Sequence, residues 1–261
     1  MALTAITREV SPSIQACELT HLGRQTIDLA LARKQHAAYC DCLRELGARV
    51  ITLPAEAALP DAVFVEDPAV VLDEIAIMTR MGAESRRGES DSLARELEKH
   101  RPLRWMKEPA TLDGGDVMRA GRVLFVGLSA RSNATGIQQL AAECEPFGYR
   151  VQPVAVQGCL HLKSAASYLG DDTVLIHRPW VDAAAFSGMR IVDVPSGEEQ
   201  GANVLLIGNT AVVATGFPET ADRIASLGRE VKLLENSELR KAEGALTCCS
   251  LLLAGAPQRR V

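Results

Sequence analysis

Apolar positions recur with helical spacing in three separate stretches of the chain. Each stretch ends in a glycine, and each glycine is followed three residues later by a valine that opens a β-branched run. A glycine in the left-handed conformation terminates many helices, and β-branched residues favour strands. Each stretch is therefore predicted to form a helix, a glycine stop and an edge strand. The three predicted units span residues 27–50, 137–151 and 221–231.

Short apolar runs separated by turn residues lie between these units. Glycine, asparagine and aspartate at the breaks are typical of hairpins. The predicted strand runs are residues 63–65, 69–72, 75–79, 116–118, 123–126, 161–168, 174–177, 204–207, 211–214 and 245–253. They form about five clusters of roughly fifty residues each, which indicates a hairpin, helix and strand repeated around a closed object. A single α+β sheet with helices on one face has the same local pattern and stays open as an alternative.

Composition narrows the class of protein. The 261 residues are 47% hydrophobic, enough to bury a core, and no linker-like stretch divides them, so residues 1–261 are expected to form one domain. With 28 basic against 33 acidic residues the net charge is −5, which argues against a nucleic-acid-binding face. No apolar run is long enough for a bilayer and the start lacks a signal-peptide layout, so neither a membrane nor a secreted protein is expected. The seven cysteines are odd in number and widely spaced, which favours free thiols in a reducing cytoplasm.

Two residues are candidates for a nucleophile and its base. Cys248 lies among small and polar neighbours in a predicted strand, where an inert buried thiol is the simpler interpretation. The adjacent Cys249 would face the other way, so at most one of the two sulfurs points into a given site. His161 alternates with leucines in another predicted strand and is either a core histidine or a strand-borne general base. A nucleophilic Cys248 would require a base or a cation nearby to favour its thiolate.

Acidic residues stand at two breaks between strand runs. Asp113 and Asp116 flank paired glycines just ahead of a predicted strand, where a tight turn alone would explain them. Glu66 and Asp67 interrupt another strand cluster, and buried acids there need either a cationic ligand or a structural arginine as partner. These carboxylates are therefore candidates to hold a histidine or a cation.

The remaining candidates are basic residues and cysteine pairs. Arg86 and Arg131 lie in loops, where a solvated arginine is the simpler interpretation and a bidentate contact to a carboxylate is the functional one. Cys40 and Cys42 have a spacing that splays two sulfurs within a helix, and no second ligand pair follows, so no metal site is predicted. No glycine-rich phosphate loop opens a helix, so no nucleotide cofactor is predicted either.

Four short motifs, in this order and at these spacings, closely resemble the dimethylarginine dimethylaminohydrolase family. They are FVED at residues 64–67, LDGGDV at 112–117, LHLKS at 160–164 and LTCCS at 246–250. The similarity continues through PD at 60–61, SRR at 85–87 and FVGLS at 125–129, so it covers nearly the whole chain. The resemblance implies the pentein fold, an α/β class in which a five-bladed α/β propeller is built from repeated ββαβ units with pseudo-fivefold symmetry. The five strand clusters agree with it.

The resemblance also implies a site, residue by residue. Cys248 matches the family's nucleophile, His161 its general acid/base, and Asp113 the carboxylate that orients the histidine. The residues that match substrate-binding positions are Leu19 in a mobile lid, Asp61 and Glu66 around the amino-acid part, Asp67 at the guanidinium, and Arg86 with Arg131 at the carboxylate. Ala245 departs from the family pattern, since mammalian relatives carry a leucine there.

The implied activity is that of an amidine hydrolase, which converts asymmetric dimethylarginine and monomethylarginine to citrulline and dimethylamine or methylamine. A Cys248 thiolate, favoured by the cationic substrate, attacks the guanidinium carbon and forms an S-alkylthiouronium. His161 protonates the departing amine and then deprotonates the attacking water. The resemblance implies no metal and no organic cofactor. The implied partner is the small-molecule substrate alone, in the cytoplasm, and relatives occur both as monomers and as homodimers.

Three other functions stay open. An arginine deiminase-like enzyme would use the same thiol chemistry on an unmethylated guanidine, although 261 residues leave little room for the extra helical domain such enzymes usually carry. A non-catalytic pentein would lack the combination of Cys248, His161 and Asp113. A cysteine peptidase would need an open groove for a polypeptide, which two arginines that cap a small ligand argue against.

Overall fold

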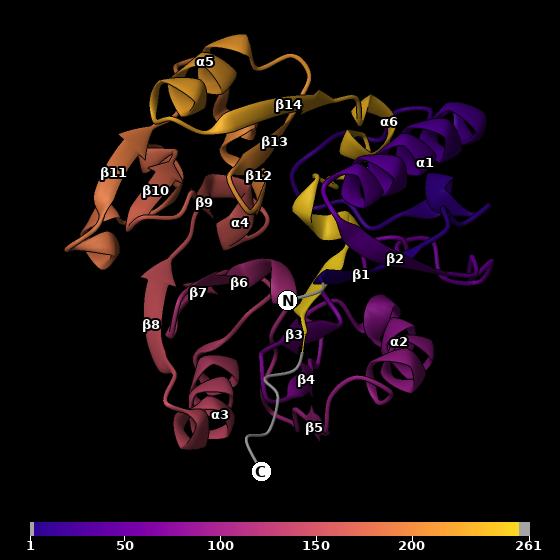
Figure 1. Cartoon of the computed structure of the whole chain (residues 1–261). Helices are drawn as coiled ribbons and strands as arrows, with labels where there is room; N and C mark the ends of the chain where they lie inside the picture. The colour runs from indigo at the N-terminus through magenta and orange to yellow at the C-terminus, as the bar shows by residue number, and fades with distance from the viewer. Residues whose placement is uncertain (1–2, 256–261) are drawn as a thin grey trace.

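The predicted repeat folds into five three-stranded β-sheets (Figure 1) in the computed structural model, which describes residues 3–255. In every sheet the middle strand is antiparallel to one neighbour and parallel to the other. The sheets consist of β15 (Leu251–Ala254), β1 (Leu3–Arg8) and β2 (Ala48–Leu53); β3 (Ala69–Val71), β4 (Ala76–Met78) and β5 (Leu103–Trp105); β6 (Val117–Ala120), β7 (Val123–Leu128) and β8 (Arg150–Ala155); β9 (Ala166–Tyr168), β10 (Thr173–Ile176) and β11 (Arg190–Asp193); and β12 (Val204–Ile207), β13 (Thr210–Ala214) and β14 (Glu230–Leu234).

A helix connects the two parallel strands in four of these sheets. A parallel pair requires such a crossover, because the chain must return to the same end of the sheet. The crossover helices are α1 (Leu29–Glu45), α2 (Ser90–Leu97), α3 (Ala134–Cys144) and α5 (Pro218–Ser226). Between β10 and β11 two 3-10 turns, Arg178–Trp180 and Ala183–Phe186, take the place of the helix. Two single-turn helices, α4 (Leu162–Ala165) and α6 (Ser237–Arg240), lie outside this pattern.

The five sheets surround a common axis, with the long helices on the outside (Figure 1). Near the centre lie β15, β3, β6, β9 and β12, which we call the first strands of the five blades. The predicted five-bladed α/β propeller is therefore confirmed, and the single-sheet alternative is wrong. The two ends of the described chain complete one blade, because β15 pairs with β1 and sets Leu3 opposite Ala254. Within residues 3–255, none of the helices has the length and apolar character that crossing a bilayer requires.

The three predicted glycine stops are confirmed. Gly47, Gly148 and Gly228 have φ angles of 87°, 76° and 83°. A Cβ at any of them would meet nothing within 4 Å, so the left-handed backbone rather than lack of space requires glycine. At the other end of α1 the Asp28 carboxylate accepts the Leu31 N–H, which caps the helix.

The apolar cores lie between neighbouring blades rather than at the axis. In one of them Phe125 of β7 packs against Phe186 of the following blade, with ring centroids 5.0 Å apart. Just ahead of the first strands of several blades the buried side chains are instead charged, among them Asp67, Asp113 and His161. The fold therefore encloses a polar centre within an apolar shell.

Two of the predicted strand runs differ from the structure, one entirely and one in part. Residues 63–65 form a buried turn, in which the Phe64 N–H donates to the Asp61 carbonyl. The run 161–168 is a strand only from Ala166, because α4 precedes it. The reason is a side chain from another blade: Asp116 Oδ1 accepts the Leu162 N–H at 2.8 Å and satisfies it without a strand partner.

The last predicted run, 245–253, is a strand only from Leu251. Residues Thr247–Cys249 form a 3-10 turn, and the Thr247 N–H donates to Asn203 Oδ1 at 3.1 Å. Apolar composition predicted a strand where a buried amide side chain fixes a turn. Cys248 and His161 therefore lie on turns and not on strands.

We expect Phe186→Ala to lower the free energy of unfolding by about 3–5 kcal/mol, because Phe186 is fully buried and its loss leaves a cavity at the one blade that lacks a crossover helix. Urea unfolding followed by circular dichroism measures the change. The exposed neighbour Ser187 provides the control, since Ser187→Ala should leave stability within about 0.5 kcal/mol of the original. Equal stability of the two variants would contradict the packing described.

Candidate active site

Most of the predicted site residues converge on one small cavity. Its volume is ≈ 20 Å³, room for a single water molecule. Six of the nine predicted site residues line it, and the three that do not are Leu19, Glu66 and Asp113. The full lining is Glu18, Asp61, Phe64, Asp67, Arg86, Arg131, Leu160, His161, Ala242, Glu243, Gly244 and Cys248.

The repeated blades bring these residues together, because each residue occupies a similar place in a different blade. Asp67 comes just before β3, Asp113 before β6, His161 before β9 and Cys248 before β15, so each precedes the first strand of a different blade. Because these strands lie near the axis (Figure 1), the segments that precede them meet there, and Asp67, His161 and Cys248 line one cavity. Residues more than a hundred positions apart in sequence thereby share one cavity.

Cys248 is the member of the cysteine pair that reaches this cavity. Cys249 is buried on the other side of the 3-10 turn, where its thiol donates to the Ala245 carbonyl at 3.5 Å. Burial, and then the nearby carboxylates of Glu66 and Asp67, raise the pKa of the Cys248 thiol well above its ordinary value. In the empty site Cys248 is therefore a thiol and not a thiolate.

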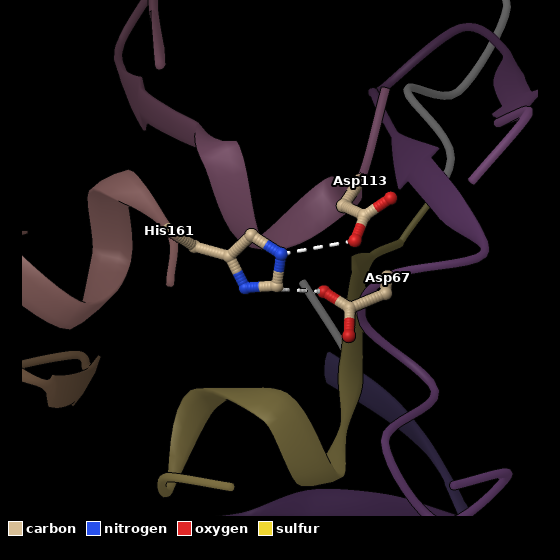
Figure 2. A group of neighbouring side chains, drawn as sticks. All are labelled: Asp67, Asp113 and His161. Atoms are coloured by element: carbon tan, nitrogen blue, oxygen red, sulfur yellow. Dashed lines mark hydrogen bonds and ion pairs between the residues drawn. The ribbon is translucent and has the colours of Figure 1, made fainter. Parts of the chain in front are cut away.

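Two carboxylates, those of Asp113 and Asp67, lie on the same side of the His161 ring (Figure 2). Its Nε2–H donates to Asp113 Oδ2 at 3.0 Å, and its Nδ1 lies 3.8 Å from Asp67 Oδ1. Glycine is required beside it, because a Cβ on Gly115 would lie 2.6 Å from His161 Nδ1. The ring is thus fixed by one strong hydrogen bond and leaves Nδ1 facing the acidic side of the cavity.

These carboxylates determine the protonation of His161. Burial by itself lowers the pKa of His161, but the Asp67 charge and the hydrogen bond to Asp113 raise it to about 9. Burial likewise raises the pKa of Asp67, whereas the His161 and Arg86 cations bring it well below its ordinary value. At neutral pH the empty site therefore contains an imidazolium, carboxylates and a neutral thiol.

Other groups fix the carboxylates in turn. Asp113 Oδ1 accepts the Gly82 N–H at 2.8 Å, and the Asp113 N–H donates to Ser132 Oγ at 3.1 Å. Asp67 Oδ1 accepts the Gly115 N–H at 3.0 Å. Each acid therefore holds its orientation through backbone contacts that do not depend on a ligand.

Asp67, Asp113 and His161 also offer three ligand atoms within 4.8 Å of one another, a grouping that could bind a metal ion. Each of these atoms already has another partner. The His161 Nε2–H donates to the Asp113 carboxylate, and Asp67 Oδ2 pairs with Arg86 Nη1 at 2.7 Å. A metal would have to displace a proton and break these ion pairs, so the donor set suits an acid–base pair better than a metal centre.

The two predicted arginines are buried, which contradicts the interpretation of solvated loop residues. Arg86 donates through Nε and Nη2 to both oxygens of Glu89, at 2.9 and 2.8 Å, and through Nη1 to Asp67. Arg131 Nη2 donates to Thr20 Oγ1 at 3.0 Å, and its Nη1 lies 3.8 Å from Asp113 Oδ2. Both guanidinium groups line the cavity.

Two of the predicted substrate-binding residues lie outside the cavity lining. Glu66 is buried beneath it, where it pairs with Lys163 and accepts a hydrogen bond from Thr247 Oγ1 at 2.9 Å. Leu19 is partly buried and packs against the largest apolar cluster, in the segment that covers the cavity. Asp61, by contrast, lines the cavity and accepts the Glu18 N–H at 3.0 Å.

Sequence reasoning missed what three supporting residues contact, although it had named Asp116 as a candidate carboxylate. Asp116 fixes the turn after His161 and also accepts hydrogen bonds from two serine hydroxyls. Lys163 neutralises Glu66, and Glu243 contributes to the cavity wall. Asp116 and Lys163 each lie within a quoted motif, but nothing in the order of residues indicates which partner each one meets.

Several known proteins are similar to this chain in sequence and in fold. A family model described as "N,N dimethylarginine dimethylhydrolase, eukaryotic" matches residues 17–182. The N(G),N(G)-dimethylarginine dimethylaminohydrolase of Streptomyces coelicolor is 41% identical over 251 residues, 95% of this chain and 96% of that protein. A solved structure of DDAH from Pseudomonas aeruginosa, a cysteine-to-serine variant complexed with citrulline, has a TM-score of 0.92 at 32% identity and covers 97% of this chain and 100% of that one. A dimethylarginine dimethylaminohydrolase adduct with S-methyl-L-thiocitrulline has a TM-score of 0.91 at 33% identity, with the same coverage.

We expect the imidazole of His161 to titrate near pH 9 rather than near its ordinary 6.5, and NMR of the ring signals measures the midpoint. Removing the charge with Asp67→Asn should move the midpoint down. Because the folded pKa lies above the unfolded one, His161 stabilises the fold fully below pH 6.5 and loses this contribution as the pH rises through about 9. A His161 midpoint at or below 6.5 would contradict the charge arrangement.

Proposed function

Because the chain belongs to the dimethylarginine dimethylaminohydrolase family, we propose that this cavity is where it hydrolyses asymmetric dimethylarginine and monomethylarginine to citrulline. The second product is dimethylamine or methylamine, and the enzyme is an amidine hydrolase. One observation carries the proposal: a thiol and an imidazolium, Cys248 and His161, line one cavity whose surrounding carboxylates call for a cation.

The positive charge of the substrate activates the nucleophile, Cys248, by favouring its thiolate. The carboxylates that raise the pKa of Cys248 are the groups that attract a guanidinium, and Asp67 is the one that lines the cavity. A guanidinium beside Asp67 adds a positive charge next to the sulfur. This charge lowers the pKa of the Cys248 thiol, which then loses its proton to solvent. Asp67 also fixes the orientation of the bound cation, and Asp113 adds negative charge from behind His161, so the reacting carbon is held next to the sulfur.

The reaction then proceeds in two halves. In the first, the Cys248 thiolate forms a C–S bond to the guanidinium carbon, His161 donates its proton to the substituted nitrogen, and the C–N bond breaks to release the amine. In the second, neutral His161 takes a proton from water, and the hydroxide adds to the S-alkylthiouronium carbon. The C–S bond then breaks while the added hydroxyl loses its proton to solvent, which releases neutral citrulline and regenerates the thiolate. Nδ1 of His161 is the atom for both transfers, because Nε2 stays hydrogen-bonded to Asp113.

The amino-acid end of the substrate is bound by the remaining polar wall. Arg86 and Arg131 bind the carboxylate, Asp61 and Glu66 act around the amino group, and Leu19 belongs to the lid that covers them. Arg131 supports this role best, because its Nη1 has no hydrogen-bond partner although it is buried. Arg86 would share its guanidinium with the acids it already meets, Asp67 and Glu89.

The geometry also weighs against the rival functions. A closed cavity of ≈ 20 Å³ offers no groove for a polypeptide, which argues against a cysteine peptidase. A non-catalytic protein would not require Cys248 to line the same cavity as His161, a histidine that is ion-paired with Asp113. Arginine as an unmethylated substrate is the rival that the assay below must separate.

We propose that the reaction needs neither metal nor organic cofactor and takes place in the cytoplasm. All seven cysteines are free thiols, a state that a reducing compartment maintains. The partner is the small substrate, and a homodimer is one assembly to test by light scattering.

Cys248→Ser should abolish citrulline release from asymmetric dimethylarginine, because a serine hydroxyl is not ionised by a neighbouring cation at neutral pH. A colorimetric citrulline assay measures the rate. Cys40→Ser is the matched control and should keep the original rate, because this thiol lies on α1 outside the cavity and the larger pocket that adjoins it, and already donates to Thr7 Oγ1. Undiminished turnover by the Cys248 variant would remove the mechanism, and faster turnover of arginine than of dimethylarginine would favour the deiminase-like alternative.

Arg131→Ala should raise the KM for free dimethylarginine by about 10²-fold, because a charged hydrogen bond to the substrate carboxylate contributes about 1.5–3 kcal/mol. Steady-state kinetics gives the value. Arg104→Ala removes an exposed arginine far from the lining residues and should leave the KM unchanged. Equal KM values in the two variants would show that Arg131 does not bind the carboxylate.

A further inference from the structure

The catalytic cavity cannot admit a substrate in the conformation observed. It holds about one water molecule, whereas small-molecule sites usually measure hundreds of Å³. A second pocket of ≈ 270 Å³ adjoins it, and the two share Leu160, Glu243 and Gly244 as wall residues. A ligand can reach Cys248 only if part of the wall moves.

The part of the wall that can move is the segment 18–22. It has no regular secondary structure, and Glu18, Thr20 and His21 are exposed. The opposite wall is fixed, since Asp67 and His161 are buried and tied to each other and to Asp113. The segment also lines both spaces, through Glu18 in the cavity and His21 and Leu22 in the larger pocket.

One side chain holds most of this segment. The Glu243 carboxylate accepts three consecutive backbone N–H groups: Thr20 at 3.0 Å on Oε2, and His21 and Leu22 at 2.5 and 2.6 Å on Oε1. Three further hydrogen bonds reach the segment: the Glu18 N–H donates to Asp61, Arg131 donates to the Thr20 hydroxyl, and the Ser85 hydroxyl donates to the Glu18 carboxylate. Asp61 and Arg131 also belong to the proposed substrate-binding set, whereas Glu243 contacts the segment alone.

The backbone at Glu243 supports a specific role for the carboxylate. Its φ is +58°, in the left-handed region where glycine is less strained. The next residue is packed tightly, because a Cβ on Gly244 would lie 2.1 Å from Phe64 Cε1. The chain therefore retains a glutamate at a position whose conformation favours glycine, and the contacts of its carboxylate to residues 20–22 offer the reason.

We propose that Glu243 is a positioning residue that latches residues 20–22 over the catalytic cavity. Release of the latch joins the cavity to the neighbouring ≈ 270 Å³ pocket and lets the substrate in, and re-formation of the three hydrogen bonds holds it there. The role in substrate binding rests on the proposed function, whereas the latch itself does not.

Hydrogen–deuterium exchange tests the latch without any need for activity. In Glu243→Ala and Glu243→Gly, exchange of the peptide that contains residues 18–24 should be faster by about tenfold or more, because the amides lose charge-assisted hydrogen bonds. Glu243→Gly is the decisive variant, since it suits the left-handed backbone and the fold should persist. Glu243→Gln, which keeps one acceptor oxygen, should lie in between. Glu98→Ala removes an exposed glutamate elsewhere and should change nothing.

Kinetics of the same variants tests the positioning role. Loss of the latch should raise the KM for dimethylarginine by about tenfold or more, a larger factor than the fall in kcat, with the glutamine variant again intermediate. Unchanged exchange of residues 18–24 would overturn the latch, and faster exchange with an unchanged KM would overturn its role in binding. If the original protein released no citrulline while its exchange responded as expected, the proposed function would fail and the latch would stand.

Discussion

The site depends on the balance of charge in a space that excludes water. Asp67 and Asp113 are buried, and a buried carboxylate is stable only with a cation or several hydrogen-bond donors nearby. His161 lies between them and supplies that charge, so its protonation and its orientation have the same cause. The propeller makes this possible because four of its blades each deliver one of the reacting or balancing residues just before an inner strand.

On the mechanism proposed above, the same balance of charge keeps the empty enzyme inactive. Asp67 raises the pKa of both His161 and Cys248, so on the proposed mechanism neither the nucleophile nor a base is ready before the substrate arrives. A cationic guanidinium changes this, since it compensates the acids near the sulfur and leaves His161 protonated for the leaving amine. Recognition of the substrate charge and activation of the thiol are then one event. A neutral molecule of the same shape would bind without ionising Cys248.

Patterns within single segments predicted the repeated elements of the fold. Contacts between distant segments determine the local structure that these patterns did not predict. Five strand clusters and three glycine stops, which are local features, indicated a unit repeated around a closed object but left a single α+β sheet open. The family resemblance then implied the five-bladed propeller that the structure has. The paired glycines were interpreted as a turn, yet Gly114 and Gly115 are needed because Glu66 and His161 approach their Cα atoms too closely for a Cβ. Likewise the strand expected around Cys248 is a turn, because Asn203, more than forty residues away, accepts the Thr247 N–H. Residue types alone left an inert cysteine and a core histidine open, and only the ordered motifs, seen as a family resemblance, indicated the chemistry.

The ionisation of Cys248 tests this account most directly. The ultraviolet absorbance of the thiolate, measured against pH in the original protein and corrected with the Cys248→Ser protein, gives the pKa of this one sulfur. A guanidinium ligand that binds but does not react should be added in a second titration. The account predicts a pKa above that of an ordinary thiol in the empty protein and a marked fall when the cation binds. A thiolate already formed near neutral pH without ligand, or a pKa that the cation does not change, would contradict it.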